Sequence, residues 1–212
     1  MTQAQGTPNK DDEQHIVVDI ETLGTSANAV IASIGAVRIT RRPWVSDLEP
    51  CLWAVHGEPF HVLLDLDQPG RVMDGATVTW WFQQEAEAQM EIVGPNVSKP
   101  YDRVNIIHGV GDLRRWIENF PNMRTTAGVW SMPDFDAALL QNVASTYRVD
   151  PCWPFWLNRD IRTAKMACPE AAGADIIGNT TITRHRSDHD ALAEAQIVCA
   201  YLNLIDRLKG GV

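Results

Sequence analysis

Short apolar runs separated by turns dominate the first third of the chain. Residues 16–22 form an apolar run that ends at a glycine-containing break, and residues 29–40 are rich in valine and isoleucine. Both segments are typical of β-strands, and the short break between them predicts an antiparallel pair. Residues 60–66 predict a third strand that closes a meander, whereas residues 41–59 show no regular pattern.

The rest of the chain alternates between helical periodicity and short strands. Helices are predicted at residues 77–90, 111–120, 160–168 and 187–209 and after Pro133-Asp134, strands at residues 126–132 and 155–158, and a mobile loop at residues 170–184. Strands that first form a meander and then alternate with helices indicate an α/β fold. A mixed central sheet flanked by helices, of the ribonuclease H-like type, is therefore expected.

Length and composition favour a single domain. The chain has 212 residues, of which 45% are apolar and 21% charged, so it can bury a substantial core. We expect a disordered leader at residues 1–13 and one domain at residues 14–212. The sequence has no apolar run that could cross a bilayer and no signal segment, and its four cysteines are scattered. A cytoplasmic protein without a membrane partner is the expectation.

The chain carries a formal charge of −9. A surface for nucleic acid usually shows as an excess of lysine and arginine, so this balance argues against a broad electrostatic footprint. Clustered carboxylates that bind metal ions count as negative in that balance, yet they form a cationic site once the ions are bound. The charge therefore does not exclude an enzyme that acts on nucleic acid.

Asp19 and Glu21 lie one residue apart in the first predicted strand. Side chains alternate between the two faces of a strand, so both carboxylates point to the same side. Adjacent anions repel each other, and one must take up a proton unless a counter-charge is present. A divalent cation that prefers oxygen ligands, Mg²⁺ or Mn²⁺, explains the pair economically. The alternative is that both are solvated residues at the end of a strand.

Two further acids lie at the start of predicted helices. Asp136 follows the central strand, at a position where the helix dipole also favours a carboxylate. Asp190 lies in the first turn of the last helix, where Ser187 and Asp190 match a capping box. Each acid alone therefore has a structural explanation. The order of all four acids along the chain, with His185 just before Asp190, is what makes the pattern specific.

This set of residues resembles the three motifs of the DEDDh family of 3′ to 5′ exonucleases. The motifs are Asp19-x-Glu21, Phe135-Asp136, and His185 with Asp190. Residues 79–84, Trp130-Ser131 and residues 158–163 resemble a subgroup of phage and bacterial exonucleases, typified by the T4-phage exonuclease and a mycobacterial exoribonuclease. Position 186 is arginine, which disfavours the sister group that uses tyrosine as the base.

The resemblance implies two divalent cations, Mg²⁺ or Mn²⁺, about 3.5 to 4 Å apart. They would hold the attacking water and the leaving oxygen of an in-line displacement at phosphorus. It implies that Asp19 contacts both ions, that Glu21 and Asp190 complete the shell of one, and that Asp136 acts at the other. His185 is implied as the general base, which suits an imidazole because its pKa lies near neutrality. The products would be nucleoside 5′-monophosphates released from a free 3′ end.

Two residues compete with these assignments. His189 is adjacent to Asp190 in the sequence and points elsewhere on a helix, so His185 is the preferred base. Asp134 competes with Asp136, but a helix-capping role explains Asp134 better.

Substrate contacts follow partly from the resemblance, which assigns the backbone of Thr22 and Leu23 to the terminal nucleotide. Arg186 flanks the implied base and is a candidate phosphate contact. Arg159 and Arg162 lie three residues apart, on one face if a helix begins there, and are further candidates. For these two, an ion pair with a neighbouring acid is an equal alternative.

A single-stranded 3′ end is the expected partner, because one terminal nucleotide must enter a narrow site and tryptophan side chains can stack on bases. No residue identifies a contact to the 2′-hydroxyl, so the strand is either RNA or DNA. A homodimer is one option for the assembly. Two other functions stay open: a catalytically silent nucleic-acid-binding module of the same fold, and an endonuclease of the wider ribonuclease H-like group.

Overall fold

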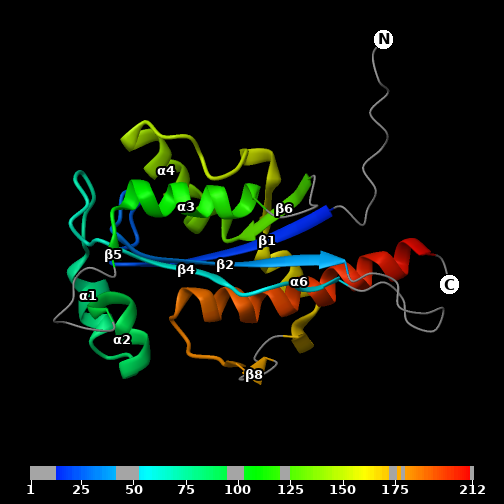
Figure 1. Cartoon of the computed structure of the whole chain (residues 1–212). Helices are drawn as coiled ribbons and strands as arrows, with labels where there is room; N and C mark the ends of the chain where they lie inside the picture. The colour runs from blue at the N-terminus through cyan, green and yellow to red at the C-terminus, as the bar shows by residue number, and fades with distance from the viewer. Residues whose placement is uncertain are drawn as a thin grey trace, which may run out of the picture.

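The computed structural model describes most of the chain (Figure 1). The described residues are 13–41, 53–94, 103–119, 125–171, 176–177 and 180–210. Residues 1–12 of the predicted leader lie outside them, and Glu13 is the first residue of β1. Part of the predicted mobile loop, residues 172–175 and 178–179, also lies outside the described residues.

A mixed β-sheet forms the centre of the molecule. Its strands are β1 (Glu13–Thr22), β2 (Ile31–Arg41), β3 (Trp53–Val55), β4 (Phe60–Leu64), β5 (Arg103–Val104), β6 (Thr125–Ser131) and β7 (Asn158–Asp160). Their order is β5-β4-β2-β1-β6-β7, with β3 paired to β2. Because β2 is antiparallel to β1 and β4, whereas β6 is parallel to β1 and β7 to β6, the predicted meander and mixed sheet are confirmed.

Helices cover both faces of this sheet (Figure 1). They are α1 (Gly75–Trp81), α2 (Ala86–Val93), α3 (Ile106–Glu118), α4 (Ala138–Tyr147), α5 (Ile161–Ala167) and α6 (Ser187–Gly210), with a π-helical turn at Pro133–Ala137 before α4. A small hairpin of β8 (Ile176–Ile177) and β9 (Thr180–Thr181) precedes α6. Helices α1 and α2 lie at the end of the sheet where β1 ends and α6 begins. No helix within the described ranges is long and apolar enough to cross a membrane.

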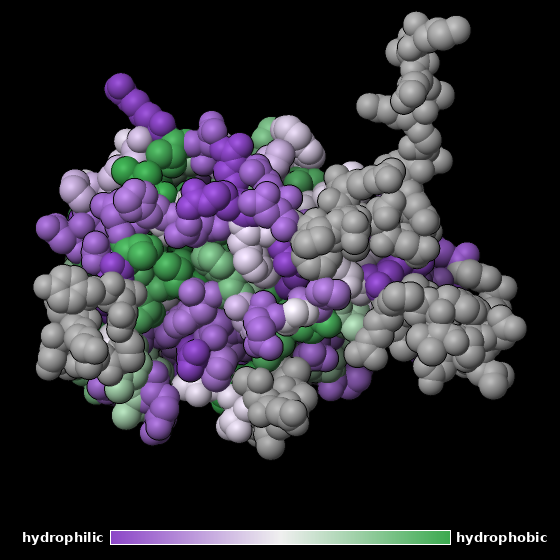
Figure 2. Space-filling model, in the orientation of Figure 1, coloured by the Kyte–Doolittle hydropathy of each residue, from purple (hydrophilic) through white to green (hydrophobic). Residues whose placement is uncertain are grey.

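Two hydrophobic cores hold the layers together. Side chains from α3 and α4 pack on one face of the sheet and side chains from α5 and α6 on the other. Along β1, Ile16, Val18 and Ile20 enter the first core, whereas Val17 enters the second. This alternation directs Asp19 and Glu21 to the α6 side. Figure 2 shows hydrophilic side chains over much of one face, with hydrophobic ones gathered between α3 and α6.

Several predicted boundaries differ from the structure. The single helix predicted at residues 77–90 is two helices, α1 and α2. In the turn between them the side-chain amides of Gln84 and Gln89 donate hydrogen bonds to backbone carbonyl oxygens. Helix α3 begins at Ile106, where the Asn105 side chain accepts a hydrogen bond from the Ile107 amide at 2.9 Å.

The short elements were missed or misassigned. Of the strand predicted at residues 155–158, residues 155–157 form a 3₁₀ turn and β7 begins at Asn158. Strands β3 and β5, of three and two residues, are too short to show an alternating pattern. Met132 precedes the turn into α4, and no side chain caps this turn.

Gly35 of β2 lets the first turn of α6 lie directly on the sheet. A Cβ atom at this position would stand 2.1 Å from the Ser187 carbonyl carbon and 2.3 Å from the Asp188 nitrogen. Both obstacles are backbone atoms, which cannot rotate away as a side chain can. Because Gly35 is the register partner of Asp19 on β1, this close approach also sets the distance between the start of α6 and the Asp19 carboxylate.

We expect Gly35→Ala to lower the free energy of unfolding by about 1 to 3 kcal/mol, because the added methyl overpacks the contact with α6. Urea denaturation of the purified full chain measures the change. Gly75→Ala is the matched control, since a Cβ there meets no atom within 4 Å. Equal stability of the two variants would contradict the argument.

Candidate active site

Three elements bring the four predicted acids together. Asp19 and Glu21 lie at the end of β1, and Asp190 lies in the first turn of α6, which packs against this part of the sheet. Carboxylate oxygens of Glu21 and Asp190 and a ring nitrogen of His185 all lie within 4.8 Å of one another. These three residues, from two segments of the sequence, thus have ligand atoms close enough together to hold a cation.

Asp136 reaches the same place from the turn that follows β6, the parallel neighbour of β1. Its side chain is 1% exposed. Atom Oδ2 accepts a hydrogen bond from the Met132 amide at 2.8 Å, whereas Oδ1 is buried and has no hydrogen-bond partner. A buried polar atom without a partner is costly, so Oδ1 is suited to an additional ligand.

The acids raise one another's pKa. For Asp19, desolvation is the largest cause and the charge of Glu21 the next, and together with Asp136 and Asp190 they hold the pKa well above its usual range. Desolvation and the charge of Asp190 raise the pKa of Glu21 in the same way. Burial raises the pKa of Asp136 to about 8, and desolvation raises that of Asp190. This electrostatic pattern calls for a compensating positive charge.

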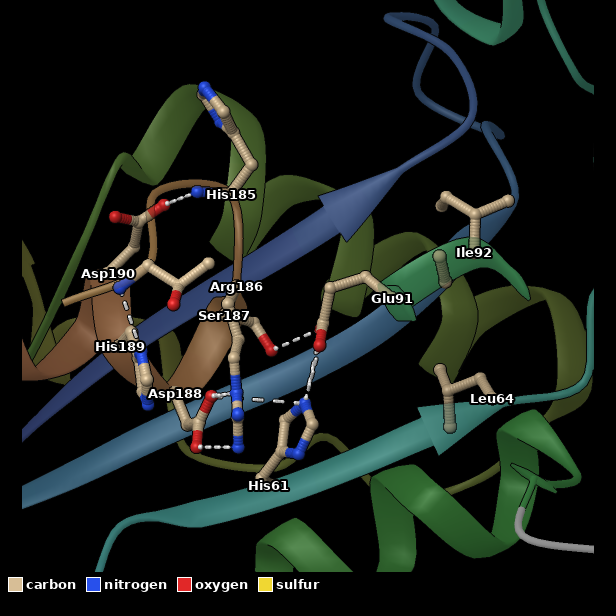
Figure 3. A network of polar contacts seen from close by, with 12 residues as sticks. His61, Leu64, Glu91, Ile92, His185, Arg186, Ser187, Asp188, His189 and Asp190 are labelled. Atoms are coloured by element: carbon tan, nitrogen blue, oxygen red, sulfur yellow. Dashed lines mark hydrogen bonds and ion pairs between the residues drawn. The ribbon is translucent and has the colours of Figure 1, made fainter. Parts of the chain in front are cut away.

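His185 lies on the segment just before α6 and has a left-handed backbone, with φ of 62°. Its backbone amide donates a hydrogen bond to Asp190 Oδ2 at 2.8 Å (Figure 3). The imidazole stands edge to face with the Trp80 ring, with 4.8 Å between ring centroids. A left-handed backbone is uncommon for a residue other than glycine. At His185 it is held by the hydrogen bond to Asp190 and the contact with Trp80.

The two competing residues have other contacts. His189 Nδ1 accepts a hydrogen bond from the Thr183 amide at 2.9 Å, so this ring nitrogen is occupied. The Asp134 carboxylate is exposed and binds the Arg162 guanidinium at 2.9 Å. Neither residue belongs to the group formed by Glu21, His185 and Asp190.

The predicted arginine contacts are engaged within the chain. Arg159 lies in β7, not on a helix with Arg162, and its guanidinium donates to the carbonyl oxygens of Trp156, Asn158 and Ala127. Arg162 binds two carboxylates, those of Asp160 and Asp134. Arg186 binds the Asp188 carboxylate, with its Nε atom at 2.8 Å. The ion-pair alternative thus describes the observed contacts of Arg162.

The backbone after Glu21 is also tied into the fold. The Leu23 amide donates to the Val30 carbonyl and the Leu23 carbonyl accepts from the Asp74 amide. The Thr22 carbonyl accepts a hydrogen bond from Trp81 Nε1 at 2.9 Å, and the Thr22 hydroxyl donates to the Gly24 carbonyl. These bonds hold α1 against the end of β1.

A cleft of about 500 Å³ opens beside the acids. It is lined by Asp19, Lys165, Arg184, His185, Asp190, Ala193, Glu194 and Ile197. Sequence reasoning missed Glu194 and Lys165, whose carboxylate and ammonium groups are 2.7 Å apart. The available signal was helical spacing, because Glu194 lies one turn after Asp190 and so shares its face of α6.

Comparisons with known proteins identify the family of the chain. A family model described as the 3′-5′ exoribonuclease Rv2179c-like domain matches residues 14–205. The chain belongs to this family. A comparison with curated proteins found no match.

Two solved structures are similar to this member of the family. E. coli exonuclease I, solved in complex with a dA16 oligonucleotide, aligns with a TM-score of 0.52 at 18% identity over 92% of this chain. The chain spans 41% of exonuclease I. Cell-death related nuclease 4 (CRN-4) aligns with a TM-score of 0.48 at 12% identity, over 92% of this chain and 66% of that one. The likeness to exonuclease I confirms the predicted ribonuclease H-like fold.

The pKa of Asp136 predicts how the metal-free protein responds to pH. The folded-state pKa of about 8 lies above the usual 3.8, so the folded protein holds the Asp136 proton more tightly than the unfolded chain does. The free energy of unfolding of wild type therefore falls as pH rises from about 3.8 to about 8. We expect Asp136→Asn to stabilise the protein relative to wild type at about pH 8 and by much less at about pH 5.

Thermal unfolding in the presence of a chelator measures this difference. The side-chain oxygen of asparagine can still accept the Met132 hydrogen bond, so the comparison isolates the charge. Asp134→Asn, at an exposed position, serves as the control and should show no such pH trend. A constant difference between wild type and Asp136→Asn across this range would contradict the prediction.

Proposed function

We propose that this chain is a metal-dependent exonuclease that removes nucleotides from the 3′ end of a single strand and releases nucleoside 5′-monophosphates. The observation that carries the proposal is the meeting of carboxylates from β1, the π-helical turn and α6 with the His185 imidazole beside one cleft. Membership in the exoribonuclease family supports the reaction class and its direction.

The four acids fit Mg²⁺ or Mn²⁺ as the ions that bind here. Their oxygens are hard ligands, Asp136 Oδ1 lacks any other partner, and their raised pKa values reflect charge that the neighbouring side chains leave uncompensated. Asp19, Glu21, Asp136 and Asp190 would hold two ions. When bound, such ions neutralise the acids and stabilise the charge that develops on the phosphate oxygens.

His185 is the proposed general base. Its imidazole accepts the proton of the attacking water, as neutral imidazole can do near neutral pH. The Asp190 carboxylate accepts a hydrogen bond from the His185 backbone amide, which fixes the backbone position from which the imidazole extends. The Trp80 face then limits the directions in which the ring can turn.

A single strand is the proposed substrate, and the exposed Trp80 ring and two of the comparisons support it. Trp80 is 40% exposed beside His185, so its ring can contact a base at the end of a strand. The family description supports RNA, and the exonuclease I structure contains a dA16 oligonucleotide. Both RNA and DNA oligomers with labelled 3′ ends therefore belong in the assay, with Mg²⁺ and Mn²⁺ compared. Thr22, Leu23, Arg159, Arg162 and Arg186 remain predicted substrate contacts.

Matched pairs of variants test the proposed roles. We expect Asp19→Ala, Asp136→Asn and His185→Ala each to lower kcat at least about 100-fold, because each removes a proposed ion ligand or the base. Asp134→Asn and His189→Ala should stay within about threefold of wild type. Release of labelled mononucleotides measures all five rates, and circular dichroism verifies folding.

Full activity in Asp19→Ala would remove the basis of the proposal. Calorimetric titration with Mn²⁺ separates the remaining cases. Absence of Mn²⁺ binding in wild type, or binding that Glu21→Ala leaves unchanged, would favour a nucleic-acid-binding module instead of an enzyme.

A circular single strand should resist the wild-type protein, whereas the same strand in linear form is degraded. An exonuclease needs a free end, and the circle offers none. Gel analysis of both forms under identical conditions gives the result, and cleavage of the circle would assign endonuclease activity instead.

A further inference from the structure

A buried network of polar side chains lies beside the start of α6 (Figure 3). At its centre is Glu91 of α2, which is 2% exposed. Both Glu91 carboxylate oxygens lie 3.1 Å from Nε2 of His61 on β4. Glu91 Oε2 also accepts a hydrogen bond from the Ser187 hydroxyl at 3.3 Å. One carboxylate therefore joins α2, β4 and α6, which are far apart in the sequence.

The network continues to the next residues of α6. His61 Nε2 lies 4.0 Å from Asp188 Oδ1, and Asp188 binds the Arg186 guanidinium at 2.8 Å. Burial lowers the pKa of His61, but its hydrogen bond to Glu91 and the charges of Glu91 and Asp188 outweigh this and raise it. His61 Nε2 is thus a hydrogen-bond partner for Glu91, which offsets the cost of burying the carboxylate.

The contact with Ser187 is close to the proposed chemistry. Ser187 is fully buried and lies two residues after His185 and three before Asp190. On its other side its backbone rests on Gly35 of β2. The first turn of α6 is therefore held between the sheet and the Glu91 carboxylate.

Other contacts hold α2 in place without this carboxylate. Ala88 packs with Leu23, Val30 and Trp81 in a separate hydrophobic cluster. The Arg103 guanidinium donates to the backbone carbonyl of Glu91 at 2.8 Å. Neither contact involves the Glu91 carboxylate. Replacement of this side chain should therefore leave α2 anchored and remove chiefly its hydrogen bond to Ser187 of α6.

We propose that Glu91 is a positioning residue, which through Ser187 and His61 fixes the first turn of α6 and so the placement of His185 and Asp190. The inference rests on the proposed exonuclease function. It assigns a role to two residues, Glu91 and His61, that the exonuclease motifs do not include.

The test uses the full chain with a labelled linear strand. Glu91→Leu should lower kcat about 10- to 100-fold with KM little changed, because a displacement of about 1 Å at a catalytic group has effects of this size. It should also weaken Mn²⁺ binding in calorimetry through Asp190. Glu91→Gln should retain most of the activity, because an amide oxygen at the Oε2 position can still accept from Ser187 and His61. Glu58→Leu, at an exposed acid, is the control and should behave as wild type.

Ser187→Ala keeps the test decisive if Glu91→Leu fails to fold. It removes one hydrogen bond and leaves α2 and the contact between Glu91 and His61 intact. We expect a smaller loss of kcat in the same direction, about three- to tenfold. Where both variants fold, their effects should not add, since they break the same link.

The outcomes separate the two proposals. If wild type hydrolyses no strand, the exonuclease proposal fails and this inference fails with it. If wild type is active but Ser187→Ala and a folded Glu91→Leu match it, only the positioning role is refuted. A loss confined to KM, or Glu91→Gln as impaired as Glu91→Leu, would also refute it.

Discussion

The burial of several carboxylates close together at the end of β1 is the constraint that the rest of this structure has to satisfy. Asp19, Glu21 and Asp136 are all desolvated, and the charges of Glu21 and Asp136 raise the pKa of Asp19 further. Folding keeps them together because the surrounding elements are fixed by two large hydrophobic cores, one on each face of the sheet. Perturbed acids of this kind are typical of functional sites, where stability is given up locally for chemistry.

Helix α6 carries much of this arrangement. Its first turn supplies Asp190 and its second turn Glu194, while later residues such as Val198 pack into the core with α5 and the sheet. The packing of a long helix fixes its axis, but the placement of its first turn depends on local contacts. Gly35 beneath that turn and the Glu91 carboxylate beside it supply those contacts.

The segment that carries His185 is constrained by its contact with Asp190. His185 has a left-handed backbone, which has an energetic cost for a residue with a Cβ atom. The Asp190 carboxylate compensates by binding the His185 amide, so one acid of the candidate site also holds the segment that carries His185.

Much of the fold and most of the acid cluster follow from the sequence. Alternation along residues 16–22 placed Asp19 and Glu21 on one face, and helical periodicity located α4 and α6, because burial of one face imposes these repeats. The motif order indicated that Asp136 and Asp190 would meet them. Very short strands such as β3 and β5 left no periodic signal, so sequence reasoning did not find them.

What only the tertiary structure decided is which side chains meet across the elements. No sequence pattern linked His61 with Glu91, and Arg159 and Arg162 were candidates for substrate contact. The structure gives the first two a shared buried network and ties both arginines to groups of the chain itself. The spacing of apolar residues along the chain indicates which face of a helix or strand is buried, because each element buries one face. Partners across elements depend on the packing of the whole, which no local pattern records.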